Sequence, residues 1–454
     1  MARFEIRLLS AMSALCVAIL AIAGRFAPQL TPDTPGYLDI VGFPAMLAQP
    51  RTPLYGWLLA VLDLGHGSYV VVPAFHIATY LAAVWLLVAQ LRRYGLSAAA
   101  GLSVGAALML ANALLIDAGW VHPELLSITC ALAAVAATVR LADTPGCRWA
   151  WALVCAGAAF AYVLRPSFLL LVVALPALYA CLIAIRGDAL RIARVAAIVV
   201  VTAAPFAGIA TLRAATVGDF NIVSFGGFAM SGMATLMLSD DVVARLPADV
   251  RPYAAQVLAA RRAGEDSGRF IGIPRNASEV RSFHSVAIAY FDVLARTYDN
   301  MLYEVIAPTQ RPGESWIDFN RRLMRFSVAV VLAAPDRYAA WVIGATTRML
   351  GRSVTTNLPA MLALLVVAAA WPWRLFRSGE IGVTPVSRLD VPVMTVLAIL
   401  WLVGAGILTM LVIAPSTRYV ETSSLLVAAP LIYWAALLLW PRTAGLPSIT
   451  AARP

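Results

Sequence analysis

The feature that most constrains this chain is a series of ten apolar runs, some only just long enough to cross a bilayer as a helix. They occupy residues 8–24, 69–91, 96–116, 124–139, 149–164, 167–185, 195–212, 358–373, 391–413 and 423–440. A transmembrane helix needs roughly 17–25 apolar residues. Because 61% of the 454 residues are apolar and 13% are charged, a soluble fold could not bury the apolar surface. The sequence therefore predicts an all-α polytopic integral membrane protein with about ten transmembrane helices.

The positive charge does not indicate a nucleic-acid partner. The net charge is +10, but the basic residues, all of them arginine, are spread between the apolar runs and form no single stripe. The five cysteines show no metal-ligand spacing, so the sequence predicts neither disulfide bonds nor a zinc site.

Arginines in the short loops predict the orientation, because such residues favour the cytoplasmic side. They are Arg3, Arg7, Arg92, Arg93, Arg140, Arg148, Arg186, Arg191, Arg194, Arg374, Arg377, Arg388 and Arg442. The pattern places both termini in the cytoplasm. The outer face then holds 25–68, 117–123, 165–166, 213–357 and 414–422. The first run resembles a signal peptide, but we expect it to be retained as a helix.

Composition shifts once along the chain, in the outer stretch 213–357, which holds 13 of the 24 acidic residues. We expect a mainly helical extracytoplasmic domain there, with interfacial or re-entrant segments at 326–334 and 338–350. Residues 1–212 then form an N-terminal transmembrane module with a first outer loop at 25–68. Residues 358–454 form C-terminal transmembrane helices and a cytoplasmic tail.

Acidic residues stand where apolar runs meet the outer face. Asp33 lies between prolines in LTPDTPGYLDI, with Asp39 six residues later, and Glu124 opens an apolar helix in DAGWVHPE. Plainer explanations exist for each. An Asp beside Pro is a common turn former, and a Glu at a helix N-terminus is favoured by the helix dipole. His122 fits an interfacial hydrogen-bonding role better than a metal-ligand role.

Three arginines also lie on the predicted outer side: Arg51 in QPRTPLYGW, Arg165 in YVLRPS and Arg418 in APSTRYVET. Arg165 and Arg418 occupy very short outer links, where the positive-inside tendency disfavours them. Their guanidinium groups suit phosphate oxygens. Alternatively, they neutralise Asp33, Glu124 or lipid headgroups.

Carboxylates and arginines on one face together indicate group transfer from a phosphate-linked donor. A carboxylate can take the proton of an acceptor hydroxyl, while arginine stabilises the charge on the departing phosphate. The sequence has no P-loop or GxGxxG motif that opens a helix. We therefore expect a lipid-anchored donor that enters from the bilayer.

The order of these motifs resembles the GT-C membrane glycosyltransferases, which use polyprenyl-phosphate sugars. The likeness is to the family 39 type, the bacterial relatives of protein mannosyltransferases and lipid A aminoarabinose transferases. It rests on the segments TPDTPGYL, RTPLYGWLL, HPELL, YVLRPS and RYVETSSLLVAAP, and it covers residues 1–215 and 390–440.

The resemblance implies a GT-C fold with an extracytoplasmic active site, Asp33 as the general base and inversion at the anomeric carbon. It implies substrate-binding roles for Tyr37, Asp39, Arg51, Tyr55, His122, Glu124, Arg165, Arg418 and Tyr419. The donor would be a polyprenyl-phosphate-linked sugar, and the acceptor a lipid, glycan or protein. Some family members use a divalent metal, but the sequence requires no cofactor.

Three alternatives stay open. A secondary transporter or lipid flippase would show related halves and ionisable groups within the membrane, whereas the apolar runs here are nearly free of charge. An O-antigen polymerase or ligase would share much of the chemistry and differ in the donor linkage. A non-enzymatic partner of an envelope complex would use 213–357 for docking.

Overall fold

The computed structural model describes residues 1–38, 42–63, 67–269, 291–378, 386–414 and 417–439. Within these ranges the chain forms helices joined by turns and no β-strand, and one isolated bridge joins Gln29 to Trp120. The described part of the chain is therefore all-α, as the sequence predicts.

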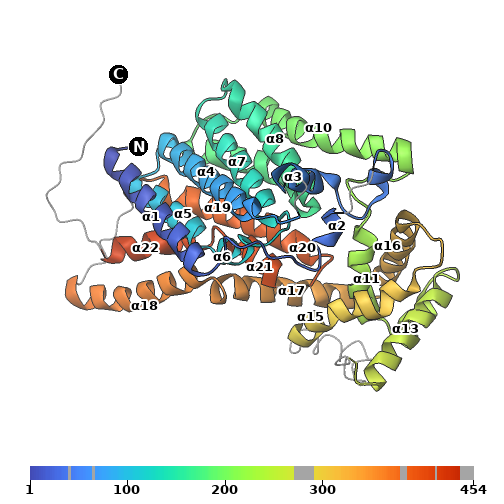
Figure 1. The fold of residues 1–454 in the computed structure, drawn as a ribbon. Helices are drawn as coiled ribbons and strands as arrows, with labels where there is room; N and C mark the ends of the chain where they lie inside the picture. The colour runs from blue at the N-terminus through green and yellow to red at the C-terminus, as the bar shows by residue number, and fades with distance from the viewer. Residues whose placement is uncertain (39–41, 64–66, 270–290, 379–385, 415–416, 440–454) are drawn as a thin grey trace.

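The N-terminal half holds the longest apolar helices (Figure 1). In chain order the elements are α1 (Arg3–Ile22), α2 (Pro35–Leu38), η1 (Ala45–Ala48), α3 (Pro53–Asp63), α4 (Val71–Tyr94), α5 (Ala98–Met109), α6 (Asn112–Asp117), α7 (Glu124–Asp143), α8 (Arg148–Leu164), η2 (Pro166–Leu170), α9 (Leu171–Arg186) and α10 (Ile192–Val217).

More polar helices follow, and apolar helices return near the C-terminus. The first group is α11 (Gly226–Met237), α12 (Asp240–Arg245), α13 (Arg251–Asp266), α15 (Phe291–Asn300), η4 (Met301–Ile306), η5 (Ala307–Thr309), α16 (Trp316–Ala333) and α17 (Pro335–Thr355). The second is α18 (Leu358–Ser378), α19 (Asp390–Trp401), η6 (Leu402–Ile407), α20 (Leu408–Met410), α21 (Thr417–Ser424) and α22 (Ala428–Leu439).

Six helices in the described ranges are long and apolar enough to cross a membrane. They are Arg3–Ile22, Val71–Tyr94, Ala98–Asp117, Glu124–Asp143, Pro166–Arg186 and Ile192–Val217. The other four predicted runs form shorter apolar helices, namely Arg148–Leu164, Leu358–Trp373, Asp390–Gly406 and Ala428–Leu439. The chain is thus a helical membrane protein, and the total of about ten spans stays a prediction.

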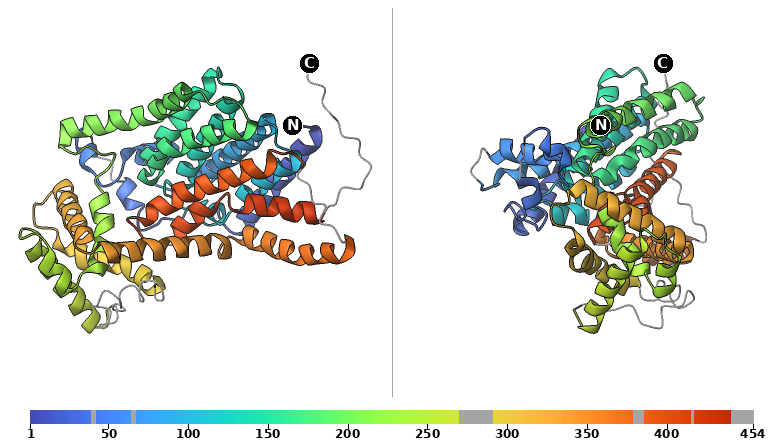
Figure 2. Two further views of the ribbon diagram at one scale, coloured as in Figure 1. Left: turned by 180° about the vertical axis from the view of Figure 1, so that it is seen from behind. Right: turned by 90° about the vertical axis from the view of Figure 1, so that its right-hand side faces the viewer.

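The main apolar core joins the two ends of the sequence. Helix α7 packs between α4 and α8, and it is the most deeply buried of the six long apolar helices. From the C-terminal part, α19 packs on α9 and α22 packs on α5, so both regions share one core (Figure 2). Because apolar faces of helices from distant segments meet here, the C-terminal helices complete the N-terminal bundle.

A second apolar core joins helices α11 to α16, which gather at one end of the bundle, to α17, which runs along the bundle against α20 and α21 (Figure 1). Helix α11 lies so close to α16 that an ideal Cβ on Gly227 would overlap the backbone oxygen of Asn320. Helices α16 and α17 meet at an angle of 100°, where Pro335 begins the second helix. The predicted interfacial segments 326–334 and 338–350 fall on these two helices.

A third, smaller core fixes the first outer loop on the bundle. Tyr37 and Tyr55 are buried there against Val121 and Leu164, which lie at the ends of helices α7 and α8. The first outer loop is thereby held over the helix ends that carry Glu124 and Arg165.

Candidate functional site

A cavity of about 560 Å³ lies where the first outer loop, the α8–η2 link, the start of α11 and the segment around α20 and α21 meet. Five of the residues selected from the sequence line it: Tyr37, Arg51, Glu124, Arg165 and Tyr419. They come from regions separated by up to 382 positions, from 37 to 419, so the fold brings them together.

Asp33 stands beside this cavity and is paired with Arg51. The Nη2 of Arg51 donates a hydrogen bond of 2.5 Å to Oδ1 of Asp33. The same guanidinium carbon lies 5.3 Å from the ring centre of Tyr37 and 5.5 Å from that of Phe225. Both charged side chains are about one quarter exposed, at 24% for Asp33 and 25% for Arg51. A polar ligand in the cavity can therefore reach this pair.

Hydrogen bonds explain why the loop holds Asp33 in place. The buried Thr34 donates from its hydroxyl to the backbone oxygen of Val121 over 2.9 Å. Its hydroxyl also accepts the backbone N–H of Thr31 at 2.8 Å, which closes the turn around Asp33. On the other side of the loop, Thr52 donates to the oxygen of Val163 at 2.5 Å. The loop is thus tied to two helix ends.

Glu124 and Arg165 form a second ion pair in the cavity wall. Nη1 of Arg165 contacts Oε1 of Glu124, and its guanidinium carbon lies 5.0 Å from the ring centre of Tyr419. Unlike the first pair, this one is buried, with 1% of the Glu124 side chain and 9% of the Arg165 side chain exposed. A buried guanidinium is stable only with such a partner.

The two pairs repeat one arrangement of a carboxylate, an arginine and a tyrosine ring. The alternative that the arginines neutralise Asp33 and Glu124 therefore describes part of their role. It does not exclude ligand binding, because Arg51 and Arg165 also line the cavity. Together they place two cations on the wall of a single chamber.

His122 lies behind Glu124, buried in the α6–α7 link. Its Nδ1 is 2.9 Å from Oε2 of Glu124, and its Nε2 is 3.9 Å from Oδ1 of Asp117. The edge of its ring packs against Trp120, with ring centres 5.2 Å apart. His122 therefore contacts Glu124 but is not among the residues that line the cavity.

Of the remaining selected residues, the structure describes the side chain of Tyr55 but not those of Asp39 and Arg418. Tyr55 is fully buried, packs edge-on against Tyr37 with ring centres 5.4 Å apart, and places its hydroxyl 3.4 Å from Nε2 of His76. Asp39 lies outside the described residues. Arg418 belongs to helix α21, but its side chain is also outside the described part of the structure.

Sequence reasoning missed Glu421, a buried carboxylic acid in helix α21. Burial, and then the nearby charge of Asp117, raise the pKa of Glu421 to about 7. An acid inside a buried segment of a membrane protein is unusual enough to mark a site. That signal was present in RYVETSS, where Glu421 follows the selected Tyr419.

Sequence reasoning also missed residues of the 213–357 stretch that reach the site. Phe225 lines the cavity and contacts Arg51, and Tyr303 stands nearby in the π-helical turn η4. Partial burial, and then the negative charge of Asp33, raise the pKa of the Tyr303 phenol, whereas Arg51 acts on it in the opposite direction. Helices of the 213–357 stretch thus form part of the candidate site.

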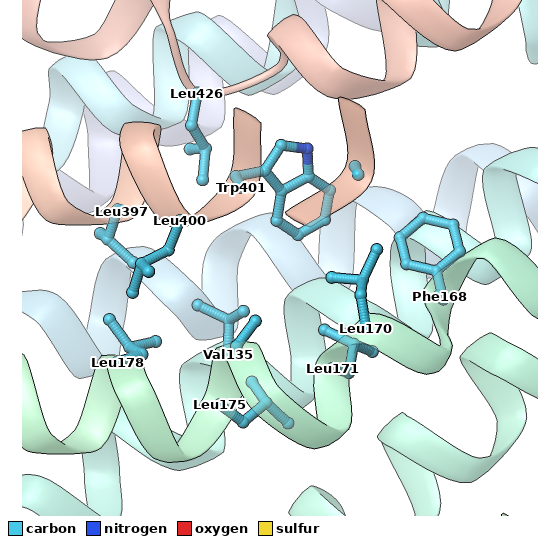
Figure 3. A pocket seen from close by; sticks show the side chains of 12 residues that line it. Val135, Phe168, Leu170, Leu171, Leu175, Leu178, Leu397, Leu400, Trp401 and Leu426 are labelled. Atoms are coloured by element: carbon cyan, nitrogen blue, oxygen red, sulfur yellow. The ribbon is translucent and has the colours of Figure 1, made fainter. Parts of the chain in front are cut away.

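A small apolar cavity of about 30 Å³ adjoins the polar one, and Leu170 lines both. In Figure 3 the side chains of Leu170, Leu175, Leu397 and Trp401 point into this space from facing helices. The polar chamber also has apolar lining residues, including Leu169 and Ile413. Its walls therefore combine two cations with a surface suited to hydrocarbon.

Among the described residues, no group of three His, Cys, Asp or Glu side chains could hold a metal ion. Comparison with family models, with curated proteins and with solved structures found no significant match to this chain.

Proposed function

We propose that this protein is an integral membrane glycosyltransferase of GT-C type that moves a sugar from a polyprenyl-phosphate donor to a lipid, glycan or protein acceptor. The observation that carries the proposal is the single cavity lined by Arg51 and Arg165, with Asp33 paired to the first arginine. The proposed location is the outer face of the bacterial inner membrane.

The reaction would be an inverting displacement at the anomeric carbon. The acceptor hydroxyl oxygen forms a bond to that carbon while the bond from the carbon to the phosphate oxygen breaks. Asp33 takes the hydroxyl proton, and the electron pair of the broken bond leaves with the polyprenyl phosphate. Arg51 and Arg165 stabilise the negative charge that grows on the phosphate.

The ion pair between Arg51 and Asp33 fits this scheme if the donor phosphate competes for Arg51. The donor phosphodiester offers the guanidinium two anionic oxygens that its planar fork can bind together, and the departing phosphate monoester gains a further negative charge. Since the pair is partly exposed, Arg51 can turn toward a phosphate in the cavity and weaken its hold on the Asp33 carboxylate, which then accepts the proton. Arg165, held by the buried Glu124, would provide the fixed part of the phosphate site.

The cavity walls support a lipid-linked donor over a soluble one. Leucine, valine, isoleucine and methionine side chains line the chamber beside the arginines. A nucleoside diphosphate has no hydrocarbon chain to bury against such a surface, whereas an isoprenoid chain gains free energy by burying there. Two of the helices that contribute lining residues, Glu124–Asp143 and Pro166–Arg186, have membrane-spanning length and composition.

The direct experiment reconstitutes the purified chain in liposomes with polyprenyl-phosphate-linked hexoses and pentoses and a panel of lipid, glycan and peptide acceptors. The proposal predicts release of polyprenyl phosphate together with a glycosylated acceptor. Absence of transfer from every donor, with the protein folded and both faces of the membrane accessible, would count against it.

A second candidate is a proton-coupled transporter or lipid flippase. It is favoured by the buried group of Asp117, His122, Glu124 and Glu421, because ionisable groups of this kind serve proton relays in membrane carriers. The same liposomes test it. Movement of labelled donor lipid between leaflets, dependent on a pH gradient and without sugar transfer, would support the carrier.

A further inference from the structure

We infer that an aromatic shelf formed by Phe225, Phe228, Tyr303 and Trp316 is a subsite that binds a pyranose ring of the acceptor. This inference rests on the proposed function, and it narrows the acceptor to a molecule that carries a sugar ring next to the hydroxyl that reacts.

The shelf is a continuous set of aromatic rings. The ring centre of Phe228 lies 5.5 Å from Phe225, 5.4 Å from Trp316 and 6.0 Å from Tyr303, and those of Phe225 and Trp316 are 6.1 Å apart. Phe228 is buried at the centre, whereas 59% of Tyr303 is exposed. Around Phe228, the half-buried rings of Phe225 and Trp316, tilted by 31° to one another, and the exposed ring of Tyr303 present faces and edges that suit the apolar C–H face of a pyranose.

Arg51 connects the shelf to the proposed base. Its guanidinium binds Asp33 and lies over the ring of Phe225, which also lines the cavity. The shelf therefore begins one side chain away from Asp33 and extends from the cavity wall toward Tyr303. A sugar on the shelf would hold one of its hydroxyl groups near the carboxylate.

Polar groups border the rings where the hydroxyl groups of a sugar would lie. The phenol of Tyr303 is within the electrostatic influence of both Asp33 and Arg51. Asn221 is exposed and lines the cavity close to Phe225 in sequence. An apolar floor with hydrogen-bonding groups at its edge discriminates a sugar from a hydrocarbon chain, because the polar edge would be left unpaired by the hydrocarbon.

The fold fixes the shelf against the first outer loop. Arg213 is buried and donates from Nη2 to the hydroxyl of Ser224, while its Nη1 donates to the backbone oxygen of Leu47. Trp316 donates from its indole nitrogen to the oxygen of Ser224 over 2.5 Å. These contacts join the shelf to the loop that carries Asp33, as a preorganised subsite requires.

Ordinary core packing explains Phe228, but it does not explain the exposed ring of Tyr303. An apolar patch on a lipid-facing surface would not need the charged neighbours Asp33 and Arg51. The position between the outer helices and the cavity mouth suits an acceptor that arrives from outside the membrane, while the donor occupies the arginine-lined chamber.

The test is saturation-transfer NMR on the full-length protein in detergent, with methyl glucoside and methyl mannoside as probes and sorbitol as the acyclic control. We expect transfer to the ring protons of the glycosides and much less to sorbitol. Tyr303→Ala should reduce the glycoside signal several-fold, whereas Tyr303→Phe, which keeps the ring and loses only the hydroxyl, should reduce it less. Trp149→Ala is the matched control. Trp149 is also exposed, but it lies in the first turn of α8, at the opposite end of that helix from Arg165.

Equal signals from glycosides and sorbitol, no signal from the wild type, or an unchanged signal in Tyr303→Ala would overturn the shelf. Failure of the subsite can be distinguished from failure of the proposed function, because glycoside binding and sugar transfer are measured separately. A protein that binds glycosides through Tyr303 but transfers no sugar keeps the subsite and loses the enzyme. A protein that transfers sugar with no glycoside binding keeps the enzyme and loses the subsite.

Discussion

Arg51 donates a 2.5 Å hydrogen bond to Asp33 at the edge of the same cavity into which Arg165 is held by Glu124. The first pair is partly exposed and the second is buried. Under the proposed function, this difference in burial would let Arg51 exchange Asp33 for the donor phosphate, while Arg165 stays in place as a fixed cation in the cavity wall.

Replacing Arg51 should weaken use of the donor. Hydrogen bonds to charged groups contribute about 1.5–3 kcal/mol, so Arg51→Gln should raise the KM for the polyprenyl-phosphate donor by about 10- to 100-fold. Arg51→Lys, which keeps the charge but loses the planar fork, should fall between the two. The exposed Arg321 provides the control, since Arg321→Gln should leave the KM unchanged. An unaltered KM in Arg51→Gln would remove Arg51 from the donor site.

Neutralising Glu124 should destabilise the fold. The change Glu124→Gln leaves the buried Arg165 without its counter-charge, and breaking such a pair costs about 3–5 kcal/mol. We expect a clear drop in the melting temperature measured by fluorescence in detergent. The matched control is Asp240→Asn, which breaks an exposed pair with Arg262 and should cost about 1 kcal/mol or less. Equal effects of both changes would mean that the Glu124 pair is not buried.

Glu421 should make stability depend on pH. Its carboxyl has a pKa of about 7 in the folded protein and an ordinary value of 4.5, so the folded state binds its proton more tightly than the unfolded state does. The stabilising effect is therefore fully present below pH 4.5 and is lost as the pH rises through 7. Glu421→Gln should flatten the melting temperature across this window. A variant with the pH profile of the wild type would refute the assignment.

The contact between helices α11 and α16 should not tolerate a methyl group. A Cβ at Gly227 would collide with the backbone of Asn320, which cannot move away as a flexible side chain could. Gly227→Ala should therefore lower the melting temperature and loosen the outer helices, detectable as faster proteolysis between 226 and 333. Gly208→Ala in α10 meets no atom within 4 Å and should be neutral or slightly stabilising. Similar melting temperatures for the two variants would contradict this packing.

The helical membrane class and several charged residues of the candidate site could be predicted from the sequence. Apolar runs predict the helical membrane class, because a bilayer requires both the length and the composition. Asp33, Arg51, Glu124 and Arg165 could be selected because charged residues are rare at such helix ends. Which carboxylate pairs with which arginine could not be predicted, since the pairing depends on how distant helices pack.

The contribution of the 213–357 stretch to the candidate site could not be predicted from the sequence. Phe225, Tyr303 and Trp316 are aromatic residues among helix-forming residues, a pattern equally typical of an ordinary soluble core. Only the packing of α11 against α16 and of Phe225 against Arg51 places them beside the cavity. For Glu421 the acid itself is visible in RYVETSS, but its neighbour Asp117 lies 304 positions away in the chain, so only the packing brings the two carboxyl groups together.

The central claim is that Asp33 accepts the proton of the acceptor hydroxyl. The most direct measurement compares sugar transfer by the wild type, by Asp33→Asn and by the control Asp188→Asn, whose carboxylate is exposed and far from Asp33 in sequence. Loss of a general base typically reduces a rate by about 10²- to 10⁴-fold, so we expect such a fall in kcat for Asp33→Asn, with normal membrane insertion and melting temperature. Transfer by Asp33→Asn at the wild-type rate would contradict the account.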